Sequence, residues 1–590
     1  MAKRGVSVVK FGSSVLRDER DLPRAVLDIY RDWRRGYDVV AVVSAFAGTT
    51  DRLLEDALRH WGNPEARALA RLLATGESVA AATLGLQLDE CGIPHTVLDP
   101  QQVGLRTCGN VLDAEPRALD AAVVHRALAE TGIVVLPGFA GCDADGMTNL
   151  LGRGGSDLTA LFLAQQLGAA SCRMVKDVEG LHPHDPHGGT PSTQPYATAS
   201  WAEALRVGRA LVQPKAMEFA QRHRVRFAIG APGSANGTKV GPYETRLRAE
   251  ASRPRVRVAL AGLGTVGLGV YRWLRRYPEQ FEVVCILVEQ AGKPRPNDVD
   301  GALLTTDPWA LLNDDADVLV ELIGGTDTAK SLLDHAITSG IDVVTANKAL
   351  LASNLHYLQR GVVSDEPRVR CSASVGGAVP VLEGLVEAAR HSRIDRIEGV
   401  LNGTCNYVLD RVVNGCDFDL AVREAQEKGI AERDPSLDLS GRDSASKLAV
   451  AAFIALGVQL DPDTIDRQGI DQLPPERIAR AANEGKVLRL VAQLERTETG
   501  WHARVHPVEL SPEHALARTR GEENAVVVYG GGASARVLRG KGAGRWPTTT
   551  SVLADLLDLH RARSRAHRVR SHPFRSDSIG SARPALRAGR

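Results

Sequence analysis

The chain has 590 residues, which is too long for a single hydrophobic core and leads us to expect roughly three or four domains. Its apolar fraction of 44% and charged fraction of 24% are those of globular proteins and exclude general disorder. Because 72 basic and 71 acidic side chains nearly cancel, charge gives no reason to expect a nucleic-acid or membrane partner.

Two further absences narrow the class of protein. The sequence has no apolar run long enough for a signal peptide or a membrane span. Its eight cysteines are scattered, without the close pairs typical of metal sites, which is usual for reduced thiols in the cytosol. We therefore expect a cytoplasmic protein.

Short β-branched runs alternate with longer helical patterns along most of the chain. We expect strands at residues 6–11, 39–43, 133–137, 257–261, 282–288, 318–322 and 342–345, with helices between them, among them residues 22–35 and 156–167. This alternation predicts doubly wound α/β domains with parallel sheets.

Two segments of the first half suit phosphate or anion binding. Lys10 ends the first strand and is followed by the small-residue turn Phe11-Gly12-Ser13-Ser14, which suits a phosphate. Residues 151–157 (LGRGGSD) join the cationic Arg153, flexible backbone amides and a helix start at Ser156, which suits an anionic ligand. An ordinary capped turn is the alternative for the second segment.

A composition change separates the halves of the chain. Residues 231–241 are rich in Gly, Pro and Ser, and residues 243–255 are charged, so we place a domain boundary near residue 250. The strand expected next runs directly into Gly262-Leu263-Gly264-Thr265-Val266-Gly267 and then a helical pattern. In this context the glycines favour a tight turn, close approach to a pyrophosphate and helix packing, which predicts a dinucleotide site.

The sequence leaves the choice of dinucleotide open. Glu289 follows the next strand and would suit the ribose of NAD, whereas Lys293 and Arg295 would suit the phosphate of NADP. Further polar segments follow other strands, at residues 321–325, 345–348, 401–407 and 431–435. Asp443 and Lys447 lie four residues apart and share one face of a helix, so they form either a functional pair or a surface ion pair.

Together the segments of the second half resemble homoserine dehydrogenases. The resemblance covers roughly residues 255–560 and rests on GLGTVG, VELIGG, VVTANKALL, SVGGAVPVL, LNGTCNYVLD, the stretch from EAQEKGIAERDP to GRDSASKLAV, and GKGAGRWPT, in that order. It implies reduction of L-aspartate 4-semialdehyde to L-homoserine with NADH or NADPH.

The resemblance also implies roles for single residues. Lys447 is the acid–base group, whose task is easier if burial or a neighbouring cation lowers its pKa, and Lys348 is that neighbour or a substrate ligand. Glu432 and Asp443 hold the substrate amino group. The remaining roles fall on a larger set: Asn402, Gly403, Thr404 and Gly377 line the cleft, and Thr345, Lys348, Gly542, Gly544 and Arg545 join Gly262, Gly264, Thr265, Val266 and Gly267 at the cofactor.

One departure concerns a cation. The family often has a carboxylate near a monovalent cation where this chain has Ser372. Backbone carbonyls near Val375 and Gly377 are then the expected ligands of such a cation.

The first half, over residues 5–230, resembles the catalytic domain of aspartate kinases, which has the amino-acid kinase fold. The resemblance adds residues 44–50, 75–77 and 137–139 to the two segments above, and implies phosphoryl transfer from ATP to the β-carboxylate of L-aspartate with Mg²⁺. Lys10 would stabilise the transferring phosphoryl group. Gly12, Ser13 and Asp177 would meet the nucleotide, and Thr50, Glu77, Arg153 and Ser156 would hold aspartate.

Several positions depart from the kinase family. The first turn is one residue shorter and is similar to that of glutamate 5-kinases. Lys176 stands where the family prefers Thr, His182 near a usual Tyr, His187 at an Arg position and Ala210 at a Lys position. Three hypotheses therefore stay open: an active kinase fused to the dehydrogenase, a degenerate kinase-like module with a structural or dimerisation role, and an amino-acid-binding regulator without turnover.

The predicted fold class is α/β, with an N-terminal amino-acid kinase fold, then a Rossmann dinucleotide-binding domain with an α+β catalytic and dimerisation domain. We assign these to residues 1–250, 251–370 and 371–560, and expect a disordered tail over the Arg-rich residues 561–590. Bifunctional aspartate kinase–homoserine dehydrogenases usually carry paired ACT regulatory domains between the two parts. About 25 residues cannot hold one, so we expect little threonine feedback through such domains, and a homodimer or larger homo-oligomer from the resemblance.

Overall fold

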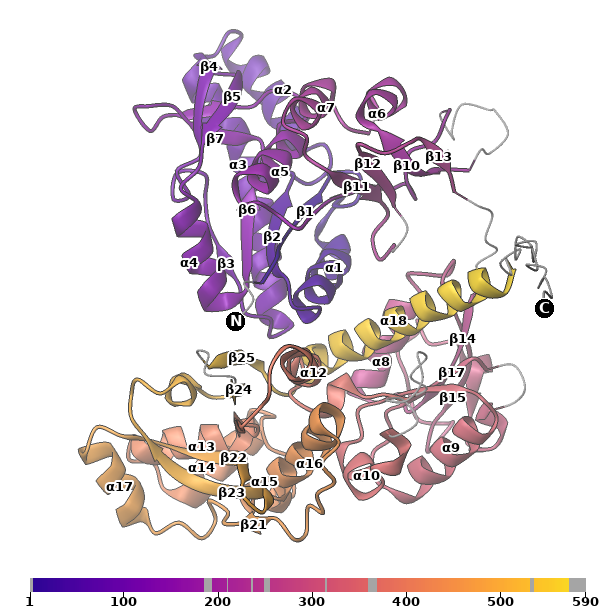
Figure 1. The fold of residues 1–590 in the computed structure, drawn as a ribbon, viewed down its shortest axis with the longest axis vertical. Coiled ribbons are helices and arrows are strands. Elements are labelled where there is room, and N and C mark those ends of the chain that lie inside the picture. The colour runs from indigo at the N-terminus through magenta and orange to yellow at the C-terminus, as the bar shows by residue number, and fades with distance from the viewer. Residues whose placement is uncertain are drawn as a thin grey trace, which may run out of the picture.

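The computed structural model describes residues 4–184, 194–209, 211–234, 237–248, 255–312, 316–358, 369–530 and 535–571. Figure 1 shows the first half of the chain packed against the second, with the long helix α18 (Arg545–Ser571) running between them. Two six-stranded sheets, one nine-stranded sheet and one four-stranded sheet form the framework of the described residues.

The nine-stranded sheet has the order β13-β10-β12-β11-β9-β1-β2-β6-β3, and β1, β2, β6 and β9 run parallel at its centre. Side chains alternate across it: Val8 and Val40 enter a core with α5 and α7, whereas Val9 and Ala41 enter a core with α1 and α3. The elements are β1 (Val6–Phe11), α1 (Leu22–Arg34), β2 (Asp38–Val43), α2 (Thr49–Trp61), α3 (Ala66–Glu90), β3 (Thr96–Val97), β4 (Arg106–Asn110), β5 (Asp113–Ala118), α4 (Ala121–Thr131), β6 (Ile133–Pro137), β7 (Ala140–Cys142), β8 (Thr148–Leu150), α5 (Gly155–Gln166), β9 (Ser171–Val175), β10 (Tyr196–Ser200), α6 (Trp201–Val207), α7 (Pro214–Arg222), β11 (Phe227–Gly230), β12 (Thr238–Gly241) and β13 (Arg246–Leu247).

The second half begins with a wholly parallel sheet of order β16-β15-β14-β17-β18-β19. It comprises β14 (Val256–Ala261), α8 (Thr265–Leu274), β15 (Phe281–Leu287), β16 (Leu304–Thr305), β17 (Val318–Glu321), α9 (Asp327–Thr338), β18 (Asp342–Thr345), α10 (Lys348–Ser353) and β19 (Val369–Arg370). Because β14, β17 and β18 are parallel neighbours, the segments that follow them meet at one edge.

A second, mostly antiparallel sheet of order β21-β23-β22-β20-β24-β25 follows. Its elements are α12 (Val381–His391), β20 (Arg396–Val400), α13 (Gly403–Val413), α14 (Phe418–Glu427), α15 (Ser436–Leu439), α16 (Arg442–Leu456), β21 (Asp466–Arg467), α17 (Pro475–Asn483), β22 (Val487–Thr497), β23 (Gly500–Leu510), β24 (Glu523–Tyr529) and β25 (Arg536–Lys541).

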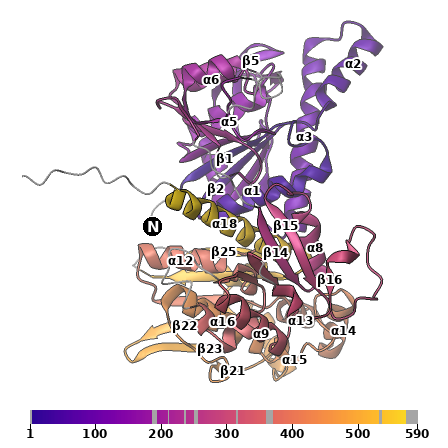
Figure 2. The ribbon, with the colours of Figure 1, turned by 90° about the vertical axis from the view of Figure 1, so that its right-hand side faces the viewer.

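Helix α18 joins the halves into one body. It packs on α8 and also contacts α1, and one continuous hydrophobic core contains Ile29 and Tyr30 of α1, Tyr271 of α8 and Leu553 of α18. Figures 1 and 2 both show α18 between the two halves. A shared core of this kind favours a fixed arrangement of the halves over independent motion.

Two expectations about local structure are corrected. Residues 561–571 belong to α18, so the disordered tail does not start at residue 561, whereas residues 572–590 lie outside the described ranges. Arg563 explains part of the difference, because it pairs with Asp317 and Asp342. The composition change at residues 231–241 is not a break in the fold, since β12 lies within this stretch and buries Thr238 and Val240 on alternate positions of the nine-stranded sheet.

Other expectations concern the thiols, the membrane and the boundary. All eight cysteines are free thiols. Among the helices of the described ranges, none is both long and apolar enough to cross a membrane. The boundary proposed near residue 250 falls in residues 249–254, which lie outside those ranges, between β13 and β14.

Candidate active sites

The glycine turn between β14 and α8 is shaped for a dinucleotide. Gly262 has a φ of 101°, and a Cβ there would lie 2.7 Å from the Leu322 carbonyl oxygen. A Cβ on Gly267 would collide with the Gly262 carbonyl oxygen, whereas one on Gly264 would meet nothing within 4 Å. The first and third glycines therefore close the turn, and open space remains beside Gly264 at the N-terminus of α8, where backbone N–H groups attract a pyrophosphate.

The loop after β15 contains side chains that suit the ribose of NAD and others that suit the phosphate of NADP. Glu289 and Lys293 are exposed and Arg295 is half-buried, and the Arg295 guanidinium donates to the carbonyl oxygens of Gln290, Ala291 and Lys293. An acidic side chain and a guanidinium fixed by its own loop thus follow the same strand.

Two lysines share the carboxylate of Asp443. Lys447 Nζ lies 2.8 Å from Asp443 Oδ2, and Lys348 Nζ lies 2.5 Å from Asp443 Oδ1. Lys447 is buried, and its Nζ also donates to the Leu401 carbonyl oxygen at 2.6 Å, whereas the Lys348 side chain is 43% exposed. The pair four residues apart on α16 is therefore an interior cluster and not a surface ion pair.

The pKa values of the two lysines shift in opposite directions. Burial, with the nearby charge of Lys348, lowers the pKa of Lys447 despite the attraction of Asp443. Asp443 raises the pKa of Lys348, and the charges of Asp438 and Glu432 add to this effect. Although burial opposes it, the two ammonium groups hold the pKa of Asp443 below its usual value. Lys447 is thus the lysine that gives up a proton more easily.

An amide and a second carboxylate complete this cluster. Asn402 Nδ2 donates to Asp443 Oδ2 at 2.9 Å and to Asp438 Oδ1 at 2.6 Å. Thr404 Oγ1 donates to the Ile430 carbonyl oxygen and lies 3.5 Å from Asp438 Oδ2. Burial and the charge of Asp443 raise the pKa of Asp438. Sequence reasoning gave Asp438 no role, although its position between Glu432 and Asp443 in a carboxylate-rich turn was a usable signal.

Glycine-rich loops approach one another beside this cluster. Gly377 has a φ of 57°, and a Cβ on it would lie 2.6 Å from the carbonyl carbon and oxygen of Gly542. A Cβ on Gly403 would lie 3.0 Å from the Cα of Glu522, which precedes β24. Gly544 follows the Gly542 loop, Arg545 begins α18, and Val375 is buried. The structure therefore brings together Gly377, Gly403 and Gly542, which are distant in the sequence.

The strand ends on the dinucleotide side are also linked. Thr345 Oγ1 donates to Glu321 Oε2 at 2.5 Å, and its hydroxyl accepts from the Asn347 backbone N–H. Burial raises the pKa of Glu321. Glu321 thereby fixes Thr345, whose strand β18 leads directly to Lys348.

In the first half, two lysines again share a carboxylate. Lys10 Nζ lies 2.6 Å from Asp157 Oδ1, and Lys176 Nζ lies 3.0 Å from Asp157 Oδ2. All three residues are buried. Burial and the charge of Lys10 lower the pKa of Lys176 to about 8. Sequence reasoning gave Asp157 no role and treated Lys176 as a departure, but the structure places both beside Lys10.

A carboxyl and a hydroxyl lie next to the lysine pair. Ser156 Oγ donates to Glu77 Oε1 at 2.6 Å, and burial raises the pKa of Glu77 to about 7 despite the charge of Lys10. A Cβ on Gly138 would lie 2.7 Å from Ser156, so the turn after β6 closes over these residues. Glu77 and Ser156, both expected to bind aspartate, are therefore brought together.

The other expected kinase residues differ in their exposure. Gly12 is buried, whereas Ser13, Arg153 and Asp177 are exposed, and Thr50 is half-buried in the first turn of α2. Of the departures, His187 and Ala210 lie outside the described residues.

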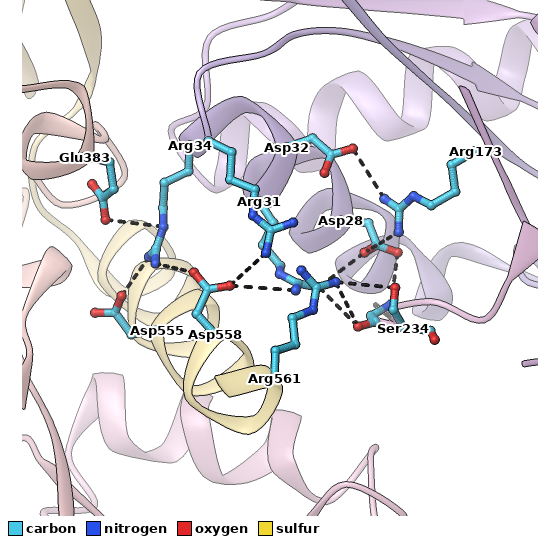
Figure 3. A network of polar contacts seen from close by, with 12 residues as sticks. Asp28, Arg31, Asp32, Arg34, Arg173, Ser234, Glu383, Asp555, Asp558 and Arg561 are labelled. Atoms are coloured by element: carbon cyan, nitrogen blue, oxygen red, sulfur yellow. Dashed lines mark hydrogen bonds and ion pairs between the residues drawn. The ribbon is translucent and has the colours of Figure 1, made fainter. Parts of the chain in front are cut away.

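Buried charges also fill the junction between the halves, as Figure 3 shows. Arg34 of α1 has a nearly fully buried side chain, with nitrogens 2.8 Å from Asp555, 2.8 Å from Asp558 and 3.3 Å from Glu383. Asp555 also accepts the backbone N–H of Ser372, three residues before Val375. Arg34 of the first half thus pairs with Asp555 and Glu383, and both of these carboxylates accept hydrogen bonds from Ser372 in the turn beside Gly377.

No group of three or more His, Cys, Asp or Glu side chains within the described ranges is arranged to hold a metal ion. A cation bound by backbone carbonyls is a different kind of site, to which this finding does not apply.

The folds and the two lysine–carboxylate clusters define a two-part enzyme. A kinase domain comes first in the chain, and an oxidoreductase with a parallel dinucleotide-binding sheet follows it. Residues 380–557 match the sequence model of homoserine dehydrogenase, residues 262–360 that of the homoserine dehydrogenase NAD-binding domain, and residues 5–230 that of the amino acid kinase family.

Individual relatives agree. The homoserine dehydrogenase of Pseudomonas aeruginosa is 36% identical over 55% of this chain and 77% of its own, and that of Bacillus subtilis is 34% identical over 51% and 72%. A solved homoserine dehydrogenase structure from Thiobacillus denitrificans has 34% identity, a TM-score of 0.49, and coverage of 54% of this chain and 76% of that one. The chain belongs to the homoserine dehydrogenase family and carries an amino acid kinase domain in its first half.

Proposed function

We propose that the second half reduces L-aspartate 4-semialdehyde to L-homoserine with NADH or NADPH, and that the first half phosphorylates the β-carboxylate of L-aspartate with ATP and Mg²⁺. The observation that carries the first activity is the buried Lys447, held between Asp443 and the Leu401 carbonyl oxygen. Both activities belong to the biosynthesis of threonine and methionine.

Lys447 is the acid in the proposed reduction. A reduced dinucleotide, whose pyrophosphate the Gly264 turn would hold, would supply the hydride when bound. Two of the three N–H donors of Lys447 meet Leu401 and Asp443, and the third donates to the substrate carbonyl oxygen. Because burial lowers its pKa, Lys447 passes its proton to the alkoxide as charge develops there.

The carboxylates divide two tasks between them. Asp443 is enclosed by Lys348, Lys447 and Asn402, so we assign it to orienting the lysines. Glu432 is exposed at the cleft, and Asp438 lies beside Asn402 and Thr404. We therefore propose Glu432 and Asp438 as the groups that hold the substrate ammonium, with Asn402, Gly403, Thr404 and Gly377 shaping the cleft around it.

In the first half, Lys10 and the Gly12–Ser13 turn would bind the transferred phosphoryl group, and Asp177 would face the nucleotide. Glu77 and Ser156 would hold the aspartate ammonium, and the exposed Arg153 its α-carboxylate, with Thr50 nearby. The Lys10–Asp157 pair supports this proposal, because a degenerate module would not need a buried cation at the end of β1.

The second candidate is a degenerate first half with a structural role. The core shared by α1, α8 and α18 favours it, since this core gives the first half a structural role even without catalysis. The test is a pair of assays on one preparation: NADPH or NADH oxidation with aspartate semialdehyde, and aspartyl phosphate formation with ATP-Mg. We expect both signals. A strong first signal with no second selects the structural role, and no first signal refutes the main proposal.

Four further points remain proposals. Ser372 supplies no carboxylate, so a monovalent cation would be held by the carbonyls of Val375 and Gly377, and dehydrogenase activity would rise when K⁺ is restored after exhaustive dialysis. Buried free thiols support a cytoplasmic location. A homodimer would appear as twice the chain mass in light scattering.

The segment between β13 and β14 is too short to hold an ACT regulatory domain, which supports weak inhibition by threonine.

A further inference from the structure

Lys176 lies at the same sheet edge as Lys10. Strands β1 and β9 are parallel neighbours, with Phe11 opposite Val175, so Gly12 and Lys176 each come one residue past a paired strand end. A Cβ on Gly12 would lie 3.4 Å from Lys10 Nζ and 3.7 Å from Lys176 Nζ. The two ammonium groups thus converge on the Gly12 turn, which is the proposed phosphate site.

Charge within this cluster is not balanced by Asp157 alone. Lys10 already lies 2.6 Å from Asp157 Oδ1, and Lys176 adds a second ammonium group at 3.0 Å from Oδ2. Burying a second cation beside one carboxylate costs free energy unless a further anion joins it. Burial and Lys10 accordingly lower the pKa of Lys176 to about 8, and a bound polyphosphate would offset this effect.

We propose that Lys176 is a second catalytic lysine of the kinase site, which binds the transferring γ-phosphoryl group of ATP together with Lys10 while Asp157 orients both. This inference rests on the proposed kinase activity and extends it to a residue that the sequence comparison counted against nucleotide chemistry. Glu77, which is near enough to Lys10 to feel its charge, and Ser156, which donates to Glu77, would present the acceptor aspartate.

The transfer step needs no further reactant. A β-carboxylate oxygen of aspartate forms a bond to the γ-phosphorus, the bond from that phosphorus to the β,γ-bridging oxygen breaks, and its electron pair leaves with ADP. Lys10 and Lys176 keep their protons throughout. Their charges offset the negative charge on the phosphoryl and bridging oxygens, which is where phosphoryl transfer is most sensitive to electrostatics.

The test compares Lys176→Met, Lys176→Arg and Lys239→Met in the full chain. Lys239 is an exposed lysine of β12 in the same sheet, so its variant controls for loss of a lysine as such. Dehydrogenase activity on the same preparation reports folding, and titration calorimetry gives the affinities for ATP-Mg and ADP-Mg. We expect Lys176→Met to lower the kinase kcat about 100-fold or more, with KM for aspartate within about twofold.

A contact to the γ-phosphoryl group also predicts a change in nucleotide preference. Lys176→Met should weaken ATP binding while leaving ADP binding within about twofold, and Lys176→Arg should keep part of both kcat and the ATP preference. A purely structural role would weaken both nucleotides alike, and that result overturns the proposal, as does a Lys176→Met variant with wild-type kcat. If the wild type lacks kinase turnover, the kinase proposal fails separately. The ATP-to-ADP affinity ratio then still decides whether Lys176 meets the γ-phosphate.

Discussion

At the scale of single residues, each half places two lysines on one carboxylate. Burial lowers the pKa of Lys447 and of Lys176, whereas Asp443 raises the pKa of the half-exposed Lys348. We therefore propose different tasks for similar side chains: proton transfer for Lys447, a permanent charge for Lys348, and anion binding for Lys10 and Lys176.

The first prediction concerns Lys447→Met, which keeps the side-chain volume but removes the proton donor. The dehydrogenase kcat should fall about 1,000-fold, while dinucleotide affinity stays within about twofold because the cofactor turn is untouched. Steady-state kinetics and fluorescence titration with NADPH measure these quantities. Lys330→Met, at an exposed lysine of α9, is the control and should change neither. Turnover that survives Lys447→Met would show that another group is the acid.

The second prediction is a pH dependence from Glu77, whose pKa is raised to about 7 by burial. Only the ionised carboxylate binds the aspartate ammonium, and its fraction grows as pH rises through 7. The kinase kcat/KM for aspartate should therefore increase between pH 5.5 and about 7, before much of Lys176, whose pKa burial lowers to about 8, loses its proton. Initial rates at low aspartate measure this, and Glu77→Gln should give a low, flat profile. A wild-type profile that is flat over this range contradicts the assignment.

At the scale of elements, the glycine turn and α18 act together on the dinucleotide site. Gly262 and Gly267 close the turn at the N-terminus of α8, and a Cβ on Gly269 would lie 2.8 Å from Thr549 of α18. Helix α18 itself begins at the loop that meets Gly377. Helices α8 and α18 therefore shape the cofactor turn together.

The third prediction uses this turn. Gly267→Ala would place its Cβ against the Gly262 carbonyl oxygen, so the turn must open and dinucleotide affinity should fall at least 10-fold. Kinase activity, which depends on another sheet, should stay within about twofold. Gly301→Ala is the matched control, because a Cβ there meets nothing within 4 Å. Equal NADPH affinities for the two variants, by fluorescence titration, would argue against a pyrophosphate at this turn.

At the scale of the whole molecule, the halves are joined by a buried ionic cluster over a shared core (Figure 3). Arg34 faces three carboxylates, while Arg561 of α18 donates to the carbonyl oxygens of Gly233 and Ser234 in the first half. Contacts in both directions fix the arrangement of the halves. The turn beside Gly377 therefore depends on a residue of the kinase domain, through Asp555 and Ser372.

The fourth prediction compares Arg34→Met with Arg35→Met. Removing Arg34 leaves buried carboxylates without their main cation and should destabilise the protein by about 3–5 kcal/mol. The Arg35 side chain is 41% exposed and pairs with Asp558 alone, so its loss should cost no more than about 1 kcal/mol. Urea unfolding followed by both activities measures the difference. Similar midpoints for the two variants would mean that the cluster contributes little to stability.

The sequence by itself determined the fold class, the central strands β1, β2, β6, β14, β15, β17 and β18, and the turn at Gly262, because these follow from local periodicity and from glycine positions that only one backbone geometry explains. Through motif order it also proposed Lys447, Asp443, Lys10 and Glu77 as site residues. Only the tertiary structure decided that Asp157 and Lys176 join Lys10, that Asp438 joins Asn402, and that Arg34 reaches Asp555. Those contacts connect residues from 19 to 521 positions apart, and their energetics depend on burial and charge balance, which local sequence does not encode.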